Sequence, residues 1–299
     1  MRNPTEVLGI CLMVLCAIPA TGYQWPLDPV SQPHGITGTL AEFRGPERGH
    51  YFHRGVDMHA AAGSPVRSVE AGTITVINDQ QVWVDDKRYL HINWHGLGLH
   101  RGDQVTRGQV IGRIAPGRQG MAPHLHFGDY DGETPENPLG PGHLDGAPGC
   151  DTESPEVIDM WFQQDNTARC LPDTCTPEGS HFTVVRGRID IVSRAQDSMP
   201  APGRDTVGVY EMSYRIRNRR LEVVEDEESF QFDTTPRDAD FSDLYQLRIT
   251  FADGSRDRST RSTYYYMATY KDGSQYDYWN TRRRAGAGED VDADSIGEA

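Results

Sequence analysis

Three histidines and one aspartate stand out because their side chains bind zinc. His53 and Asp57 lie four positions apart, and His124 and His126 lie two apart much later in the chain. Imidazole nitrogens and carboxylate oxygens are ligands that a catalytic zinc ion takes up readily. Such an ion usually takes three protein ligands and keeps a fourth position open. The four residues would therefore supply three ligands and leave one histidine for proton transfer, as in a zinc hydrolase.

The segment that must position these residues has the pattern of β-strands. Residues an even number apart in a strand point to the same face, so each pair can present both side chains to one site. Residues 72–78 alternate and are rich in β-branched side chains, and a second run covers residues 82–92, with a hairpin expected between them. Residues 105–114 and 124–130 complete the pattern. We predict an all-β, mostly antiparallel domain over residues 23–148.

Six motifs occur in a fixed order within this segment. They are His53-x-Gly-x-Asp57, Gly63-Ser-Pro-Val66, Ala71-Gly72, Tyr89-Leu-His91, Gly102-x-x-Val105-x-x-Gly108-Gln-x-Ile-Gly112 and Pro123-His-Leu-His-Phe127. Over roughly residues 35 to 140 this order resembles the lysostaphin and LytM-type zinc endopeptidases, which are peptidoglycan hydrolases of the duplicated-hybrid-motif fold. The resemblance implies that fold and one bound zinc ion.

The resemblance also implies a role for each motif residue. Its metal ligands correspond to His53, Asp57 and His126, and its unliganded catalytic histidines to His91 and His124. One imidazole would accept a proton from the attacking water, and the other would stabilise the oxyanion or protonate the leaving amine. His59 is an alternative ligand, because it lies two residues beyond Asp57 and could share its face.

Three features depart from the family pattern. The stretch between His91 and Gly102 is longer than usual, Gly128 stands where an acidic residue often follows, and residues 115–121 lack a Ser-Thr-Gly run. These positions border the cleft expected to hold the substrate, so they bear on specificity first. The resemblance predicts a zinc metalloendopeptidase that hydrolyses amide bonds in the peptide stems or cross-links of peptidoglycan. The alternatives are an exported protease acting on proteins and a non-catalytic wall-binding or activator protein of the same fold.

The first 22 residues have the pattern of a signal peptide. Arg2 precedes an apolar run at residues 7–20, which is too short to span a membrane, and small residues follow. We predict a secreted or periplasmic protein without a membrane span in its mature chain. Lipidation at Cys16 is the less favoured alternative, because the residues before it are not small.

The chain is acidic. It has 44 Asp and Glu against 29 Lys and Arg, a formal net charge of −15. Repulsion makes nucleic acid and other polyanions unsuitable partners. The expected partner is peptidoglycan, and the sequence indicates no oligomeric state.

Residues 149–180 are rich in Pro, Asp, Glu and Cys and predict an irregular linker, with a helical turn at residues 156–164. Cys150, Cys170 and Cys175 allow three single disulfide pairings, each of which leaves one thiol over.

Beyond this linker, short alternating runs over residues 181–282 predict a β-sandwich of immunoglobulin-like type. Tyr276, Tyr278 and Trp279 could stack on wall glycans, although packing within the sandwich is favoured. Residues 283–299 are expected to be disordered.

Overall fold

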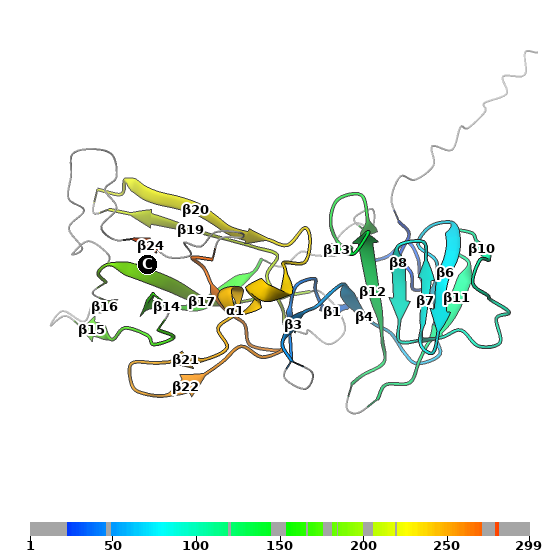
Figure 1. Ribbon diagram of the computed structural model, residues 1–299, viewed down its shortest axis with the longest axis horizontal. Coiled ribbons are helices and arrows are strands. Elements are labelled where there is room, and N and C mark those ends of the chain that lie inside the picture. The colour runs from blue at the N-terminus through cyan, green and yellow to red at the C-terminus, as the bar shows by residue number, and fades with distance from the viewer. Residues whose placement is uncertain are drawn as a thin grey trace, which may run out of the picture.

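The protein is described here by a computed structural model (Figure 1). It describes residues 23–45, 49–118, 121–144, 154–165, 167–175, 181–183, 185–199, 206–218, 220–270 and 279–280. Several predictions fall outside these residues: the signal peptide with lipidation at Cys16, the disulfide partner Cys150, the Tyr276 and Tyr278 pair, and the tail at residues 283–299. No helix among the described residues is both long enough and apolar enough to cross a membrane.

The first half of the chain forms two antiparallel sheets and a short hairpin, which confirms the all-β prediction. The larger sheet has the order β1-β4-β12-β8-β7-β6-β10, with β13 added beside β12. Its strands are β1 (Ile36–Gly38), β4 (Val56–His59), β6 (Gly72–Asn78), β7 (Gln81–Val84), β8 (Lys87–Leu90), β10 (Gln104–Val105), β12 (His124–Asp131) and β13 (Thr134–Glu136). The smaller sheet joins β5 (Pro65–Arg67), β11 (Val110–Ile114) and β9 (Ile92–Asn93), and the hairpin pairs β2 (Phe43–Arg44) with β3 (Tyr51–Phe52).

The predicted hairpin after residue 78 is confirmed, because β6 pairs with β7. The run expected over residues 82–92 is divided into β7, β8 and β9. The chain turns after β7 at Asp85, whose φ is 49°, and again at His91, whose φ is 66°. Each turn uses a left-handed residue that the alternating pattern does not reveal. We call β1 and β4 to β13 the N-terminal body.

Alternation along β12 directs the apolar side chains to one face and the histidines to the other. Leu125 and Phe127 are fully buried in the core of the N-terminal body, together with Val56 and Met58 of β4. The register pairs Leu125 with Met58 and His126 with Asp57. Cross-strand partners share a face, so the packing that buries Leu125 brings Asp57 and His126 together on the other face.

The second half of the chain, which we call the C-terminal body, is also antiparallel. Its main sheet has the order β14-β17-β18, with β23 and β24 also paired to β17, and three hairpins accompany it. The elements are β14 (Glu156–Gln164), β15 (Asp173–Cys175), β16 (His181–Thr183), β17 (Arg188–Ser198), β18 (Thr206–Val207), β19 (Glu211–Arg217), β20 (Val223–Gln231), η2 (Asp238–Asp240), α1 (Phe241–Leu244), β21 (Ile249–Thr250), β22 (Arg256–Asp257), β23 (Tyr265–Met267) and β24 (Trp279–Asn280). Its immunoglobulin-like type stays a prediction.

The helical turn expected at residues 156–164 is wrong. This segment is strand β14, which pairs along its length with β17. The pairing partner lies far along the chain, and its hydrogen bonds override a weak local pattern. Residues 156–164 are therefore part of a sheet, although the predicted linker boundaries themselves stay a prediction.

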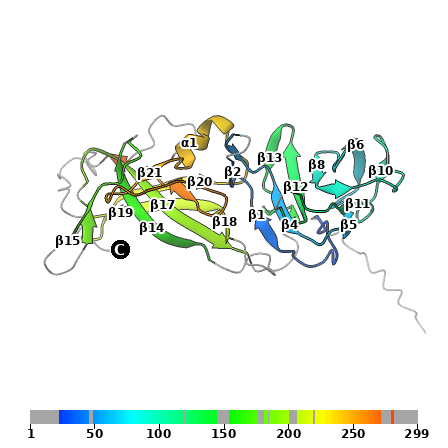
Figure 2. The same ribbon diagram turned by 90° about the horizontal axis from the view of Figure 1, so that it is seen from below.

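The hairpin β2–β3 lies between the two bodies (Figures 1 and 2). Its Phe43 and Phe52 belong to the hydrophobic cluster of the C-terminal body, where both contact Phe241 with ring centroids 5.1 and 4.9 Å apart. In the opposite direction, Met199 and Val207 of the C-terminal body join the N-terminal cluster. The hairpin thus completes the core of the C-terminal body, and residues of the C-terminal body complete the N-terminal core, so apolar burial holds the two bodies in place.

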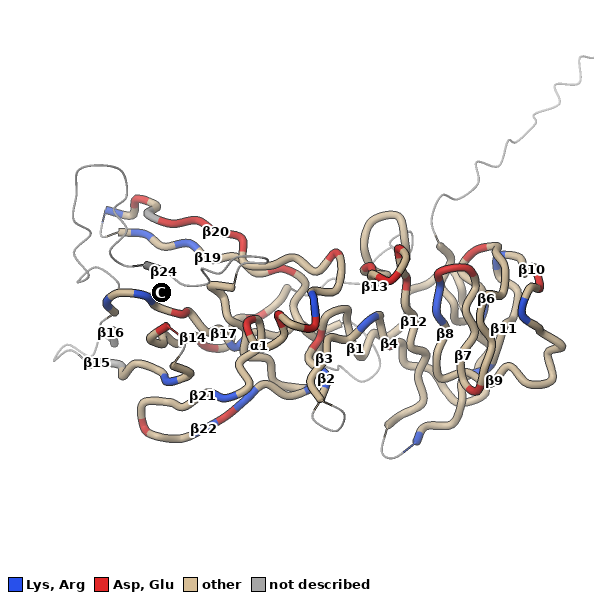
Figure 3. Tube along the Cα trace, viewed as in Figure 1, with Lys and Arg blue, Asp and Glu red and all other residues tan. Residues whose placement is uncertain are grey.

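Acidic residues are concentrated on β20 (Figure 3). Residues 225–228 read Glu-Asp-Glu-Glu, and Arg215 of the neighbouring β19 lies 2.7 Å from Asp226. An exposed pair of this kind contributes little to stability. Part of the negative charge therefore lies on the C-terminal body, on the hairpin β19–β20.

Candidate metal centre

Side chains from two adjacent strand regions converge at one point on the N-terminal body. Nε2 of His53 lies 3.1 Å from Oδ1 of Asp57 and 2.9 Å from Nδ1 of His126, and the last two atoms are 3.0 Å apart. The side chains of His53, Asp57 and His126 are 6%, 16% and 9% exposed. The three expected metal ligands therefore form one compact, largely buried group.

Gly55 allows β4 to approach β12 at this point. Its φ is +158°, and a Cβ there would lie 2.4 Å from the carbonyl oxygen of Phe127. No larger residue fits so close to a neighbouring backbone. The glycine of the His-x-Gly-x-Asp motif thus permits the strand contact that brings Asp57 opposite His126.

The donor set fits a zinc ion. Ligands about 2.0–2.1 Å from a tetrahedral ion lie about 3.3 Å from one another, and the three donor atoms here are 2.9–3.1 Å apart. A small outward movement of the three atoms would admit the ion. Two imidazoles and one carboxylate leave a fourth position, as in catalytic zinc sites.

The hydrogen bonds of His53 select the nitrogen that faces the centre. Nδ1 lies 2.8 Å from the carbonyl oxygen of Thr39 and 3.2 Å from Nη2 of Arg44, and these two contacts require opposite tautomers. The shorter contact favours donation by Nδ1 to Thr39. Nε2 then keeps its lone pair toward Asp57 and His126, as a metal ligand must.

The charge states of the other two ligands also suit a metal. Burial opposes ionisation of Asp57, but His53 and His126 outweigh it and hold the pKa of this carboxyl well below its ordinary value. Burial lowers the pKa of His126 to about 4, against the opposing effect of Asp57. At neutral pH the carboxylate is charged and the imidazole is neutral, which are the forms that bind metal ions.

His124 and His91 lie beside this group. Nδ1 of His124 is 2.9 Å from the carbonyl oxygen of Ala122, which leaves Nε2 directed at the centre, 3.8 Å from Oδ1 of Asp57. The rings of His91 and His124 are 4.6 Å apart at 60°. Burial, and next the nearby His124, lower the pKa of His91 to about 4. His91 is therefore a neutral imidazole at neutral pH.

The alternative ligand His59 is on β4 opposite His124 but is exposed. The ligand atoms that converge are those of His53, Asp57 and His126, and His59 is not among them. The structure thus brings together all five residues predicted from the motifs and leaves His59 at the edge.

A second group in the described part of the chain, formed by Asp129, Glu136 and His143, also has ligand atoms close together. Nζ of Lys87 lies 3.0 Å from one oxygen of Asp129, and Nδ1 of His143 lies 2.6 Å from the other. Both carboxylate oxygens are therefore engaged, and a buried ammonium already supplies the positive charge. This arrangement is a structural ion-pair network centred on Asp129.

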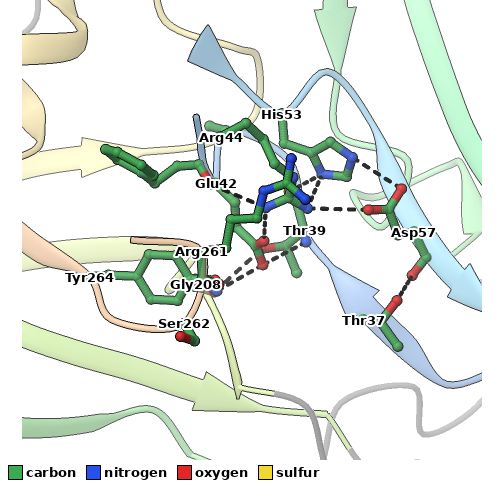
Figure 4. Close-up of polar contacts among 12 residues, drawn as sticks. Thr37, Thr39, Glu42, Arg44, His53, Asp57, Gly208, Arg261, Ser262 and Tyr264 are labelled. Atoms are coloured by element: carbon green, nitrogen blue, oxygen red, sulfur yellow. Dashed lines mark hydrogen bonds and ion pairs between the residues drawn. The ribbon is translucent and has the colours of Figure 1, made fainter. Parts of the chain in front are cut away.

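Sequence reasoning missed Glu42 and Arg44, two buried charged residues beside the centre (Figure 4). Arg44 lies 3.2 Å from Oδ2 of Asp57, and it pairs with Glu42 at 2.5 Å. Burial disfavours the charge on Arg44, but the carboxylates of Glu42 and Asp57 keep its pKa above the ordinary value. No sequence motif marks them, because Arg44 ends the two-residue strand β2 and Glu42 precedes it.

Comparison with known proteins identifies the region around this centre. Residues 51–138 match the family model of Peptidase family M23. The L-Ala--D-Glu endopeptidase of Bacillus subtilis (strain 168) is 29% identical over 125 residues, which cover 36% of this chain and 38% of the relative. The chain thus spans well under half the length of this curated relative. The matched family region contains His53, Asp57, His91, His124 and His126, whereas Glu42 and Arg44 precede it.

Two solved structures are also similar. A zinc-containing peptidase from Vibrio cholerae is 26% identical, covering 40% of this chain and 39% of that chain with a TM-score of 0.33. The catalytic domain of lysostaphin from Staphylococcus simulans is 23% identical, covering 36% of this chain and 90% of that chain with a TM-score of 0.30. The family match and the Bacillus subtilis relative together confirm the resemblance to LytM-type peptidases for this region of the chain.

Proposed function

We propose that the protein is a secreted zinc metalloendopeptidase that hydrolyses amide bonds in the peptide part of peptidoglycan. The observation that carries this proposal is the convergence of His53, Asp57 and His126 within 3.1 Å of one another, with Nε2 of His124 directed at the same point. Three ligands, an open fourth position and an adjacent imidazole are the parts that a metal-assisted hydrolase requires.

The five residues of the site would have the following roles. His53, Asp57 and His126 would hold one zinc ion, which supplies a Lewis acid and lowers the pKa of water to roughly 7. His124 and His91 would transfer protons, because both imidazoles lie beside the ligands and outside the ligand set. One would accept a proton from the attacking water, and the other would hydrogen-bond the developing oxyanion or protonate the leaving amine.

The substrate class is supported by the curated relative. The Bacillus subtilis protein is named an L-Ala--D-Glu endopeptidase, so its name specifies a bond to a D-amino acid. Such residues occur in the peptide stems of peptidoglycan and not in ordinary proteins. We therefore assign the peptide portion of peptidoglycan as the substrate class. Export would be required for contact with this polymer.

The test is incubation of the mature protein with purified peptidoglycan and, separately, with an unfolded protein such as casein. We expect soluble muropeptides with new amino termini from peptidoglycan, loss of release with a zinc chelator, and recovery when zinc is restored. Cleavage of casein without muropeptide release would replace the proposed substrate with protein. Absence of cleavage of either substrate by zinc-loaded protein would contradict the proposed activity.

A further inference from the structure

Asp57 divides its two carboxylate oxygens between different partners. Oδ1 faces His53 and His126, where the metal ligand atoms converge. Oδ2 accepts a hydrogen bond from Nη2 of Arg44 at 3.2 Å. Groups that hydrogen-bond a metal ligand orient it and tune its affinity for the metal. Arg44 is therefore placed to keep Oδ1 directed at the metal position.

Gly38 provides the space in which the end of Arg44 lies. A Cβ at this position would be 2.3 Å from Nη2 of Arg44 and 3.0 Å from Oδ2 of Asp57. The guanidinium thus occupies a site that any other residue at position 38 would obstruct. Its side chain is 9% exposed, so few water molecules can replace its protein partners.

Glu42 holds the other side of the guanidinium and links it to the C-terminal body. One carboxylate oxygen accepts from Nη1 of Arg44 at 2.5 Å. The other accepts from the backbone N–H of Thr39 at 2.8 Å and from the backbone N–H of Gly208 at 2.9 Å. Gly208 follows β18 of the C-terminal body, and Figure 4 shows Gly208 and Tyr264 close to this cluster.

We propose that Arg44 is a positioning residue for the metal ligand Asp57, and that Gly208 of the C-terminal body completes the metal centre by orienting Glu42 against Arg44. This inference rests on the proposed zinc function. The C-terminal body would then be required for tight metal binding in addition to any role in substrate attachment. The chain of contacts runs from Gly208 through Glu42 and Arg44 to Asp57.

The first test measures zinc affinity of the full mature chain by competition with a chromophoric chelator. Arg44→Gln should bind zinc about 10- to 100-fold more weakly, the usual effect of removing a group that orients a ligand. The visible spectrum of the cobalt-substituted protein should change as well, because the geometry of Asp57 changes. Arg67→Gln is the matched control, because Arg67 lies outside the centre, where its Nε is 2.8 Å from Oδ1 of Asp28. This variant should bind zinc as the wild type does.

The second test displaces Arg44 without removing it. Gly38→Ala places a methyl group where Nη2 lies and should weaken zinc binding in the wild-type background. In the Arg44→Gln background the same substitution should add little, because the group it displaces is already absent. Equal losses in both backgrounds would mean that the methyl group acts on Asp57 directly, and would overturn the role of Arg44.

The third test acts from the C-terminal body. Gly208→Ala places a Cβ 2.9 Å from Cγ of Glu42 and should weaken zinc binding through Glu42. Ile249→Ala is the control, since Ile249 is fully buried in the C-terminal cluster and its truncation lowers stability without touching Glu42. A loss of zinc affinity in Gly208→Ala alone supports the proposal. Equal losses of zinc affinity in both variants would mean that the contact of Gly208 with Glu42 only stabilises the fold, and would overturn the proposal.

The outcomes separate this inference from the proposed function. Wild-type protein that binds no zinc would contradict both. Wild-type protein that binds zinc and releases muropeptides, together with an Arg44→Gln variant of unchanged zinc affinity and cobalt spectrum, would overturn the role of Arg44 alone.

Discussion

Asp57 and His126 are direct cross-strand partners on β4 and β12, and Oδ1 of Asp57 lies 3.0 Å from Nδ1 of His126. This pairing depends on register, because a slip of one residue would turn one of the two side chains to the opposite face. Leu125 and Met58, the neighbouring pair, are fully buried and hold the register. The core therefore specifies which residues can meet at the metal centre.

Gly55→Ala should damage this pairing. The added Cβ would lie 2.4 Å from the carbonyl oxygen of Phe127, so β4 and β12 must separate beside Asp57. We expect a loss of about 1–3 kcal/mol in the free energy of unfolding and a lower zinc content. Chemical denaturation and metal analysis would measure these changes. Gly132→Ala is the control, because Gly132 also has positive φ but has open space around it. Equal effects of both variants would contradict the proposed steric cause.

His91→Asn should remove activity while leaving the metal bound. His91 has a φ of 66°, which asparagine tolerates better than most residues, so the backbone should be kept. Loss of a residue that transfers protons typically reduces the rate by about 10²- to 10⁴-fold. Muropeptide release and zinc content would be measured together, with His95→Asn, in an exposed position, as the matched control. Loss of zinc from His91→Asn would instead assign His91 to the ligand set.

Lys87→Met should destabilise the protein without changing its zinc content. Asp129 has a 1% exposed side chain and depends on Lys87 at 3.0 Å for compensation of its charge. Breaking a buried pair costs about 3–5 kcal/mol, to be measured by urea denaturation. Asp86→Asn, which neutralises one of the two exposed carboxylate partners of Lys87, should cost less than about 1 kcal/mol. A second zinc ion in the wild type that disappears in Asp129→Asn would refute the structural role of this network.

Phe241→Ala should weaken the junction between the two bodies. Phe241 is 4% exposed and contacts Phe43 and Phe52 of the hairpin β2–β3. Truncation of a buried phenylalanine costs about 3–5 kcal/mol. Leu221→Ala, at a position 72% exposed, is the control and should have little effect on the free energy of unfolding. A cost for Phe241→Ala as small as that of the control would show that this packing does not stabilise the protein.

The sequence was informative where chemistry and local spacing coincide. His124 and His126 lie two residues apart along β12, so their approach at one face could be predicted from the amino-acid sequence alone. His53 and His91 lie outside the strands, and only the resemblance predicted their place beside the centre. The all-β architecture followed from the same alternation. The roles of His53, Asp57 and His126 as ligands, and of His91 and His124 in proton transfer, stay predictions until they are measured.

The sequence was less informative where long-range contacts decide the structure. Strand β14 is specified by its pairing with β17, and no local pattern distinguishes it from a turn of helix. Arg44 and Glu42 could not be linked to the centre, because their contacts with Asp57 and Gly208 join parts of the chain that are distant in sequence. The packing of the hairpin β2–β3 into the core of the C-terminal body was hidden for the same reason.

The most direct test compares the zinc content and muropeptide release of the mature wild-type protein with those of His126→Ala and His124→Ala. We predict about one zinc ion per wild-type chain, loss of the ion in His126→Ala, retention in His124→Ala, and loss of hydrolysis in both variants. Retention of zinc and hydrolysis by His126→Ala, or absence of zinc from the wild type, would contradict the assignment of His53, Asp57 and His126 as a catalytic zinc site.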